Sequence, residues 1–282
     1  MNNEKLNDRV FFSAMLPSVC PKVYKGLTDL LDKYSVPYSL LQGTNDIWCR
    51  DYMPMQSRTA NELIGYNYSP DYLHANPEYE ATITDGVDVA KNIGGFHVHK
   101  SDVVIDGGNV VFCDDKVVMT AKVFEENPGW SVSALSKWLE DRLMAEIVFL
   151  PWDTTEKFGH ADGICRYAGN GSLIMTNYRQ FDADMANRYI KCLNPHFKNV
   201  TELHYNSRHL NPSSWSYINF LQTDKLIIVP SLNSEEDEQA LNQLELLIPD
   251  YKGRIEMFDA REIVKMGGAF NCCSWTVKSK IC

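Results

Sequence analysis

Several features that define major protein classes are missing from this sequence. It has no run of eighteen consecutive apolar residues, the length that a membrane-spanning helix needs. Residues 1–10, MNNEKLNDRV, are polar and lack the basic start and apolar stretch of a secretory signal. No clustered basic stripe is present, and the net charge is -10, the opposite of what a nucleic-acid-binding surface requires. We therefore expect a cytoplasmic protein that binds neither membrane nor nucleic acid.

The eight cysteines do not form a C-x-x-C pair or a zinc-type spacing. An even count permits disulfides, but a chain of 282 residues without a secretion signal can bury a core without them. Most of the thiols are expected to be small buried hydrophobic groups, and no metal or other cofactor is predicted. The composition, 44% hydrophobic and 23% charged, is that of a globular protein. An acidic chain of this kind attracts cationic ligands.

The sequence repeats itself about every 55 residues. Similar segments begin at Asp106, Ala161 and Ser216, and each contains a short strand-like run, a polar turn and a second apolar run: VVMT, LIMT and LIIVP. Stepping back from the first copy reaches ELIGYNY, and stepping forward from the third reaches CCSWTVK near the C-terminus. The segments therefore predict hairpins at a regular interval.

Helical patterns fill the gaps between these hairpins. Apolar residues recur at three- and four-residue spacing in four stretches: 23–34, 132–144, 183–193 and 236–248. A fifth helix, less clearly patterned, is expected between Ile83 and Phe96. Asp182 and Ser234 occupy expected N-cap positions, and a proline follows the end of each of those two helices.

Five such units use almost the whole chain, so we predict one α/β domain over residues 1–282, built as a five-bladed pseudo-symmetric α/β propeller. Pairing of VFFSAML with CCSWTVK would close the units into a ring and protect the sheet edges. A doubly wound sheet is the alternative, but it predicts no five-fold period.

The repeat also brings chemically useful residues into register. Asp51, Asp106, Asp162, Asn219 and Cys272 follow one another at intervals of 55, 56, 57 and 53 residues, and His160 lies beside Asp162. Equivalent positions in a closed ring face one axis. The register therefore predicts that carboxylates, an imidazole, an amide and a thiol meet at one site.

This set of groups favours chemistry on a cation. Cys272 is the candidate nucleophile and His160 the candidate proton carrier, because a thiolate forms beside a base and imidazole titrates near neutral pH. Asp162, two residues on, is expected on the same side of a strand as His160, where it would reach the substrate beside it. Three carboxylates in one pocket repel one another unless a cation lies between them, and a guanidinium matches them in charge and shape. Trp48 offers its ring to such a cation or to its alkyl chain.

Each residue also has a purely structural interpretation. Asp51 could pair with Arg50, and Asp106 could start the turn at Gly107 and Gly108. Trp48 could pack in the core, Asn219 could satisfy backbone groups, and Cys272 could be a buried thiol. The common register of the five units favours function over these alternatives.

The same segments resemble the guanidino-group-modifying superfamily, which includes agmatine deiminases, peptidylarginine and arginine deiminases, dimethylarginine hydrolases and amidinotransferases. DIWCRDYMP is similar to its W-x-R-D-x-x-P segment, VIDGGNVV to its [DE]-G-G-N strand, and GHADGICRY to its G-H-x-D-G segment. The C-terminal AREIVKMGGAFNCCS is similar to the closing segment of agmatine deiminases. Asn271 stands where that family commonly has histidine.

The resemblance implies a metal-free hydrolase that converts agmatine or a related guanidine to a ureido product and ammonia through a covalent thiouronium. It implies that Cys272 is the nucleophile, His160 the general acid and base, and Asp51, Asp106 and Asp162 the partners of the guanidinium. Ser274 favours Cys272 over its neighbour Cys273, since the family nucleophile precedes a Ser or Thr by two residues. An amidinotransferase, a peptidyl-arginine deiminase and a non-catalytic binding protein for arginine-like ligands are the alternatives, and a homo-oligomer is possible.

Overall fold

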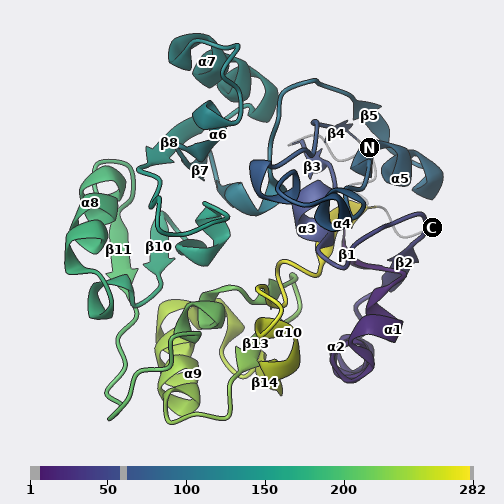
Figure 1. Cartoon of the computed structure of the whole chain (residues 1–282). Coiled ribbons are helices and arrows are strands. Elements are labelled where there is room, and N and C mark those ends of the chain that lie inside the picture. Colours follow the sequence, from purple (N-terminus) through teal and green to yellow (C-terminus); the bar gives the residue numbers. More distant parts are fainter. Residues whose placement is uncertain (1–6, 58–61, 280–282) are drawn as a thin grey trace, which may run out of the picture.

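The computed structural model describes residues 7–57 and 62–279. Residues 1–6, part of the stretch from which the absence of a secretory signal was argued, and Cys282 lie outside these ranges. The described chain is a mixed α/β protein with five three-stranded sheets that follow one another around the molecule (Figure 1). This arrangement rules out the single doubly wound sheet considered as the alternative.

All five sheets share one topology, in which a short strand pairs antiparallel with a middle strand and the middle strand pairs parallel with an outer strand. In the order short, middle and outer, the strands are β15 (Trp275–Ser279), β1 (Asn7–Ser13) and β2 (Tyr38–Leu41); β3 (Met55–Gln56), β4 (Glu62–Ile64) and β5 (His97–His99); β6 (Val111–Cys113), β7 (Lys116–Thr120) and β8 (Glu146–Leu150); β9 (Cys165–Gly169), β10 (Ser172–Met175) and β11 (Asn199–Glu202); and β12 (Leu221–Gln222), β13 (Ile227–Ser231) and β14 (Ile255–Asp259).

One main helix connects the middle and outer strands of each sheet: α2 (Pro21–Lys33), α5 (Gly86–Ile93), α7 (Val132–Leu143), α8 (Ala183–Leu193) and α9 (Glu236–Leu247). The expected hairpin, helix and strand therefore occur in all five units, including the helix between Ile83 and Phe96. Shorter elements are α1 (Leu16–Val19), α3 (Cys49–Tyr52), α4 (Pro77–Glu80), α6 (Lys122–Glu125) and α10 (Arg261–Val264), and the 3₁₀ turns η1 (Asp71–Leu73), η2 (Gly107–Asn109), η3 (Ala161–Gly163), η4 (Tyr178–Gln180), η5 (Ser214–Ile218) and η6 (Pro249–Tyr251).

The main helices form because each carries one apolar face at helical spacing. In α7, Leu135, Leu139 and Leu143 are four residues apart and all buried. Burying a leucine side chain of this size contributes roughly 2 kcal/mol, which is more than helix propensity supplies. Packing against the sheets therefore fixes the position of these helices.

One of the two N-caps predicted from the sequence is present in the structure. The Asp182 side chain accepts a hydrogen bond from the Met185 amide at the start of α8. Ser234 does not cap α9, because that helix begins at Glu236, as its apolar pattern predicted, and Glu235 occupies the N-cap position. The Ser234 hydroxyl instead lies 3.0 Å from the Tyr217 hydroxyl.

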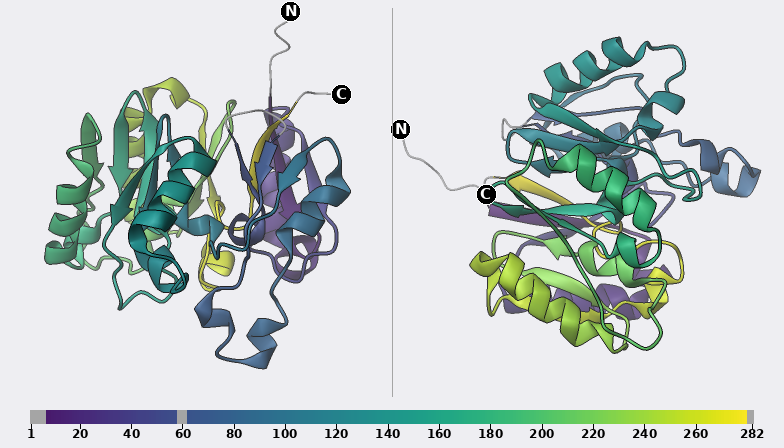
Figure 2. Two further views of the ribbon diagram at one scale, coloured as in Figure 1. Left: turned by 90° about the horizontal axis from the view of Figure 1, so that it is seen from above. Right: turned by 90° about the vertical axis from the view of Figure 1, so that its left-hand side faces the viewer.

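The two ends of the described chain meet in one sheet. β1 pairs antiparallel with β15, with Phe11 opposite Trp275, and parallel with β2 on its other side. The predicted pairing of VFFSAML with the Trp275 strand is therefore confirmed, and Figure 2 shows the two strands side by side. Among the described helices, none is long and apolar enough to cross a membrane.

Short helical turns precede the short strand of each sheet. α3 leads into β3, η2 into β6, η3 into β9 and η5 into β12, and a turn at residues 271–273 leads into β15. The residues that share the sequence register lie on or beside these turns. The expectation that His160 and Asp162 lie on one strand is wrong, because His160 caps η3 and Asp162 belongs to that 3₁₀ turn.

Candidate active site

The Cys272 thiol lies among polar groups from three units. Its Sγ atom is 3.3 Å from Asn219 Oδ1 and 3.7 Å from Asp162 Oδ2. The backbone holds the residue from both sides, since the Cys272 amide donates to Asn219 Oδ1 and the Cys272 carbonyl accepts from the Arg50 amide at 3.0 Å. The thiol is only 7% exposed, so it meets a substrate inside a cavity rather than at the surface.

Cys273 points away from this cluster. Its Sγ donates to the Phe270 carbonyl and it is fully buried, while the Cys49 thiol donates to the Cys273 carbonyl. Two cavities, described below, reach the Cys272 thiol, and Cys273 lines neither of them. The two vicinal cysteines therefore face different surroundings, although they lie in a turn and not on the strand that the sequence suggested.

His160 lies between two carboxylates. Its Nε2 atom is 2.7 Å from Asp106 Oδ2, without the alignment of a hydrogen bond, and its Nδ1 atom is 4.0 Å from Asp51 Oδ1. The preceding peptide is held by Thr120, whose hydroxyl donates to the Gly159 carbonyl at 2.6 Å. Thr120, at the buried end of β7, therefore fixes the backbone position from which the His160 side chain extends.

The electrostatics of this group favour a protonated imidazole. Burial alone would lower the pKa of His160, but the negative charges of Asp106 and Asp51 outweigh burial and raise the pKa to about 10. At neutral pH the imidazole therefore carries a proton that it can deliver to a leaving group.

Burial and neighbouring negative charges disfavour the ionised forms of Asp51 and Cys272. Burial, followed by the charge of Asp106, raises the pKa of Asp51 well above its usual value, and its Oδ1 atom is buried without a hydrogen-bond partner among the described residues. Burial and the charges of Asp162 and Asp51 likewise raise the pKa of the Cys272 thiol. A cation placed in the cavity would stabilise both the carboxylate and the thiolate.

A second layer holds Asp162 in place. Asn271 donates from Nδ2 to Asp162 Oδ2 at 2.6 Å and accepts on Oδ1 from Arg166 Nη1 at 2.8 Å. Asn271 is 3% exposed, and its bond to Asp162 is buried. Asn271, which stands where the similar family commonly has histidine, therefore connects Arg166 to the carboxylate beside Cys272.

Close contact explains the adjacent glycines of η2. A Cβ atom on Gly107 would lie 2.1 Å from the Arg50 carbonyl, and one on Gly108 would lie 2.4 Å from His160 Nδ1 and 2.8 Å from Asp51 Oδ1. Only a residue without a side chain lets the η2 backbone approach the imidazole this closely.

Gly108→Ala is expected to displace His160 and lower kcat by at least about 100-fold, since a shift of about 1 Å in a catalytic group has an effect of that size. Steady-state ammonia release measures the loss. Gly129→Ala is the matched control, because a Cβ at Gly129 meets open space away from the site, and it should keep most activity. Equal activity of the two variants would show that the imidazole does not need its present position.

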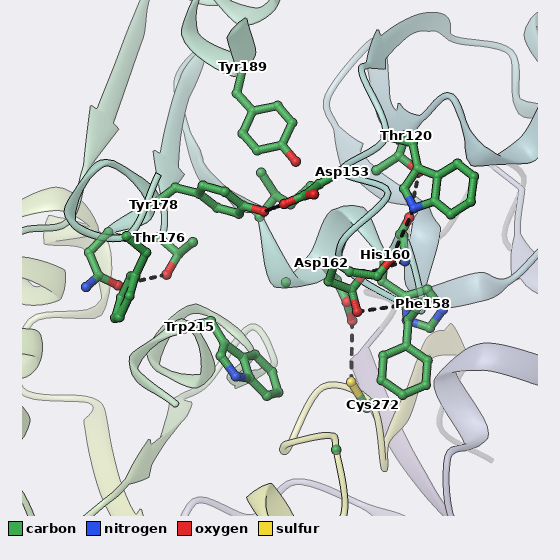
Figure 3. A pocket seen from close by; sticks show the side chains of 18 of the residues that line it. Thr120, Asp153, Phe158, His160, Asp162, Thr176, Tyr178, Tyr189, Trp215 and Cys272 are labelled. Atoms are coloured by element: carbon green, nitrogen blue, oxygen red, sulfur yellow. Dashed lines mark hydrogen bonds between the residues drawn. The ribbon is translucent and has the colours of Figure 1, made fainter. Parts of the chain in front are cut away.

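Two cavities reach the thiol. The larger, of about 430 Å³, is lined by His160, Asp162 and Cys272 and by aromatic side chains, and Figure 3 shows Asp162 and Cys272 pointing toward each other at one end of it. The smaller, of about 270 Å³, is lined by Trp48, Asp51, His160 and Cys272.

Five of the seven predicted site residues line these cavities: Trp48, Asp51, His160, Asp162 and Cys272. Asp106 and Asn219 do not. Asp106 is covered by His160 and by the Tyr72 hydroxyl, which donates to Oδ2 at 2.6 Å. Asn219 is fully buried behind the nucleophile, where it contacts the Cys272 amide and thiol.

Sequence reasoning missed several residues of the site. Tyr72 lies in an insertion that is not part of the repeat, and it packs edge-on against Phe158, whose ring centroid is 5.7 Å from that of His160. Lys122 donates to the carbonyls of Lys157 and Phe158 and pairs with Asp71 at 2.9 Å. It therefore links the His160 loop to the Tyr72 segment. No repeat position marks these residues.

Asp51, Asp106 and His160 place one potential metal-ligand atom each within 4.8 Å of the others. The two carboxylates that raise the pKa of His160 would also attract an organic cation bound in the adjacent cavity.

The fold is that of solved agmatine deiminases. The C. jejuni agmatine deiminase superposes with a TM-score of 0.76 at 16% identity, covering 100% of this chain and 96% of that one. The Enterococcus faecalis agmatine deiminase gives a TM-score of 0.72 at 17% identity, covering 99% and 95%.

The chain belongs to the Porphyromonas-type peptidyl-arginine deiminase family, whose pattern it matches over residues 31–277. Among curated relatives, candidate agmatine deiminases from Shewanella baltica (strain OS223) and Shewanella sp. (strain MR-4) are 25% and 24% identical over an alignment of 223 positions that covers 66% of this chain. The match spans 59% of the length of these relatives.

Proposed function

We propose that this chain is a cysteine-dependent deiminase that hydrolyses a small guanidine, agmatine or a close relative, to a ureido product and ammonia. The observation that carries the proposal is a buried Asp51 oxygen that has no hydrogen-bond partner among the described residues, in the cavity that the Cys272 thiol also lines. A guanidinium would satisfy that carboxylate and promote ionisation of the thiol at once.

The proposed reaction begins when the bound guanidinium lowers the pKa of the Cys272 thiol. The thiol proton passes to Asp162, whose Oδ2 atom is 3.7 Å from Sγ, and the sulfur attacks the guanidinium carbon. Protonated His160 gives its proton to one nitrogen of the tetrahedral intermediate. The carbon–nitrogen bond breaks, ammonia leaves, and a thiouronium joined to Cys272 is formed.

Neutral His160 then takes a proton from water, and the hydroxide adds to the thiouronium carbon. When the second tetrahedral intermediate collapses, the carbon–sulfur bond breaks and Asp162 returns its proton to the sulfur. The hydroxyl of the intermediate loses its proton as the ureido carbonyl forms, and that proton converts the released ammonia to ammonium. The sum is a guanidinium ion and water giving a ureido product and an ammonium ion. Asn271 acts in this scheme as a positioning residue for Asp162.

The charges on the walls of the larger cavity favour a substrate that has no carboxylate. Among the described residues that line it, none is Lys or Arg, whereas Asp153 and Glu156 contribute negative charge. An amine at the far end of the substrate is compatible with these walls, and an α-carboxylate would be left without a partner. Lys157 lines the smaller cavity, so a carboxylate would find a cation only there.

A panel of agmatine, free arginine and N-acetyl-arginine amide, assayed for ammonia and ureido product, tests the proposal. Agmatine is expected to give a kcat/KM roughly 100-fold above that of arginine, because a buried, unpaired carboxylate costs about 3 kcal/mol. Faster turnover of the peptide-like substrate would favour the peptidyl-arginine alternative. Transfer of the amidino group to an added amine, without ammonia release to water, would favour the amidinotransferase.

The five sheets and their common topology support the further proposal that residues 1–282 form one domain, a pseudo-symmetric α/β propeller with the reactive residues about its axis. In this arrangement each helical turn before a short strand supplies one functional group.

A further inference from the structure

A third cavity lies on the other side of the residues that bear the active site. It has a volume of about 330 Å³ and is walled by the short strands β6, β9, β12 and β15 of four sheets. Arg50 and Asn271 line it, whereas their chain neighbours Asp51 and Cys272 line the cavities described above. Among the described residues, none is shared between this cavity and the two active-site cavities. We call it the arginine cavity.

Two guanidinium groups lie in the arginine cavity without an ion-pair partner among the described residues. Within the described part of the chain, Arg50 forms no side-chain hydrogen bond or ion pair, and its Nε atom is buried and unsatisfied. Arg166 donates, within residues 7–57 and 62–279, only to the neutral oxygens of Asn271 and of the Phe220 carbonyl, at 2.8 and 3.2 Å. The buried Thr276 hydroxyl, also on the cavity wall, has no hydrogen-bond partner in that part of the chain either.

This arrangement is unfavourable while the cavity contains no anion. Burial, together with the nearby charge of Arg50, lowers the pKa of Arg166 to about 10. Two carboxylates of described residues lie nearby. Asp162 is connected to Arg166 only through Asn271. Asp250 lines the cavity but is an exposed residue. Neither one forms an ion pair with the two guanidinium groups among the described residues.

We propose that the arginine cavity is a binding site for a small oxyanion, a carboxylate or a phosphate, held between Arg50 and Arg166. Guanidinium groups recognise both anions through paired N–H donors, and the Thr276 hydroxyl supplies a further donor. The remaining wall includes Val110, Val111 and Phe112, so an anion with a short apolar body fits as well as an inorganic one. This site does not depend on the proposed deiminase activity.

The charge of the two kinds of cavity keeps their ligands apart. The active-site cavities carry Asp51, Asp162 and, behind them, Asp106, which repel an anion. The arginine cavity carries the opposite charge and repels a guanidine. The affinity of the arginine cavity for an oxyanion should therefore not change when Cys272 is substituted.

Isothermal titration with inorganic phosphate and with succinate, at ionic strength held constant with chloride, tests the proposal. At least one of the two should bind saturably with one site per chain, and the tighter one identifies the preferred headgroup. Arg50→Gln and Arg166→Gln should each weaken binding roughly tenfold or more, because each removes one cation from a buried anion. Cys272→Ser should leave the affinity unchanged.

Gln222→Glu keeps both arginines, so it tests the proposal even if the Arg50 and Arg166 variants do not fold. Gln222 lines the cavity, and the isosteric change puts a negative charge into it. The expected result is again a loss of affinity of roughly tenfold or more, now by repulsion and by occupation of the arginines. Absence of saturable binding of either anion to the wild-type protein would refute the proposal, as would equal affinity in wild type and Gln222→Glu, or loss of binding in Cys272→Ser.

Discussion

Cys272→Ser is expected to abolish guanidine hydrolysis, with a fall in kcat on the order of 10⁴-fold or more. A hydroxyl is a far poorer nucleophile than a thiolate unless a base removes its proton. The groups beside this position are the Asn219 amide oxygen and the Asp162 carboxylate, at 3.3 and 3.7 Å from the sulfur. Neither is strong enough as a base to activate serine. Ammonia release from agmatine measures the effect.

Cys273→Ser is the control, and it should retain most activity. Cys273 is buried behind the site, and its thiol donates to the Phe270 carbonyl. Mass spectrometry after treatment with 2-chloroacetamidine should locate the label on Cys272. A neutral haloacetamide should react more slowly at pH 7, since it does not supply the cation that lowers the raised thiol pKa. Labelling of Cys273 with Cys272 untouched would overturn the assignment.

His160→Gln is expected to lower kcat by roughly 10²- to 10⁴-fold, the range that general acid and base catalysis contributes. Glutamine keeps a polar group of similar reach but cannot deliver a proton to departing ammonia. Substrate binding should not weaken, because the change removes a positive charge from a cavity that receives a cation. The expected signature is a fall in kcat with KM equal or lower, measured by steady-state kinetics on agmatine.

The pH dependence gives a second measurement of the same group. The folded pKa of His160 is raised to about 10, so its proton is present at neutral pH and is lost as the pH rises through that value. The wild-type rate should therefore decline on the alkaline side, and this decline should be missing in the residual activity of His160→Gln. His99→Gln, at an exposed histidine paired with Glu62, is the matched control. A normal kcat in His160→Gln would exclude the proposed proton carrier.

The repeat allowed most of the architecture to be predicted, since it depends on local patterns. The apolar faces of the five main helices and the hairpin runs recur at one interval, and each recurrence supports the others. Ser234 shows the limit, because its hydroxyl contacts Tyr217 and Glu235 occupies the N-cap position of α9 instead. A local pattern does not show which of two adjacent residues a tertiary contact will hold in place.

The site was predictable where it follows the register and unpredictable elsewhere. Asp51, His160, Asp162 and Cys272 lie together because equivalent turns precede equivalent strands. Their backbone form was not foreseen, since a 3₁₀ turn of three residues, such as η3, has no sequence period. Tyr72 reaches Asp106 from an insertion outside the repeat, and the bond between Arg166 and Asn271 joins residues that are 105 positions apart. Such contacts depend on the assembled fold.

The pairing of β1 with β15 also determines when Cys272 reaches its neighbours during synthesis. Residues 7–11 find their antiparallel partners only at 275–279, so the sheet that contains them stays incomplete until nearly the whole described chain has left the ribosome. Cys272 precedes β15 by three residues and is anchored by Arg50, far upstream. The thiol thus joins its carboxylate neighbours only at the last step of assembly. Nascent chains would accumulate four of the five sheets without reactivity toward guanidines, and closure and activity should appear together.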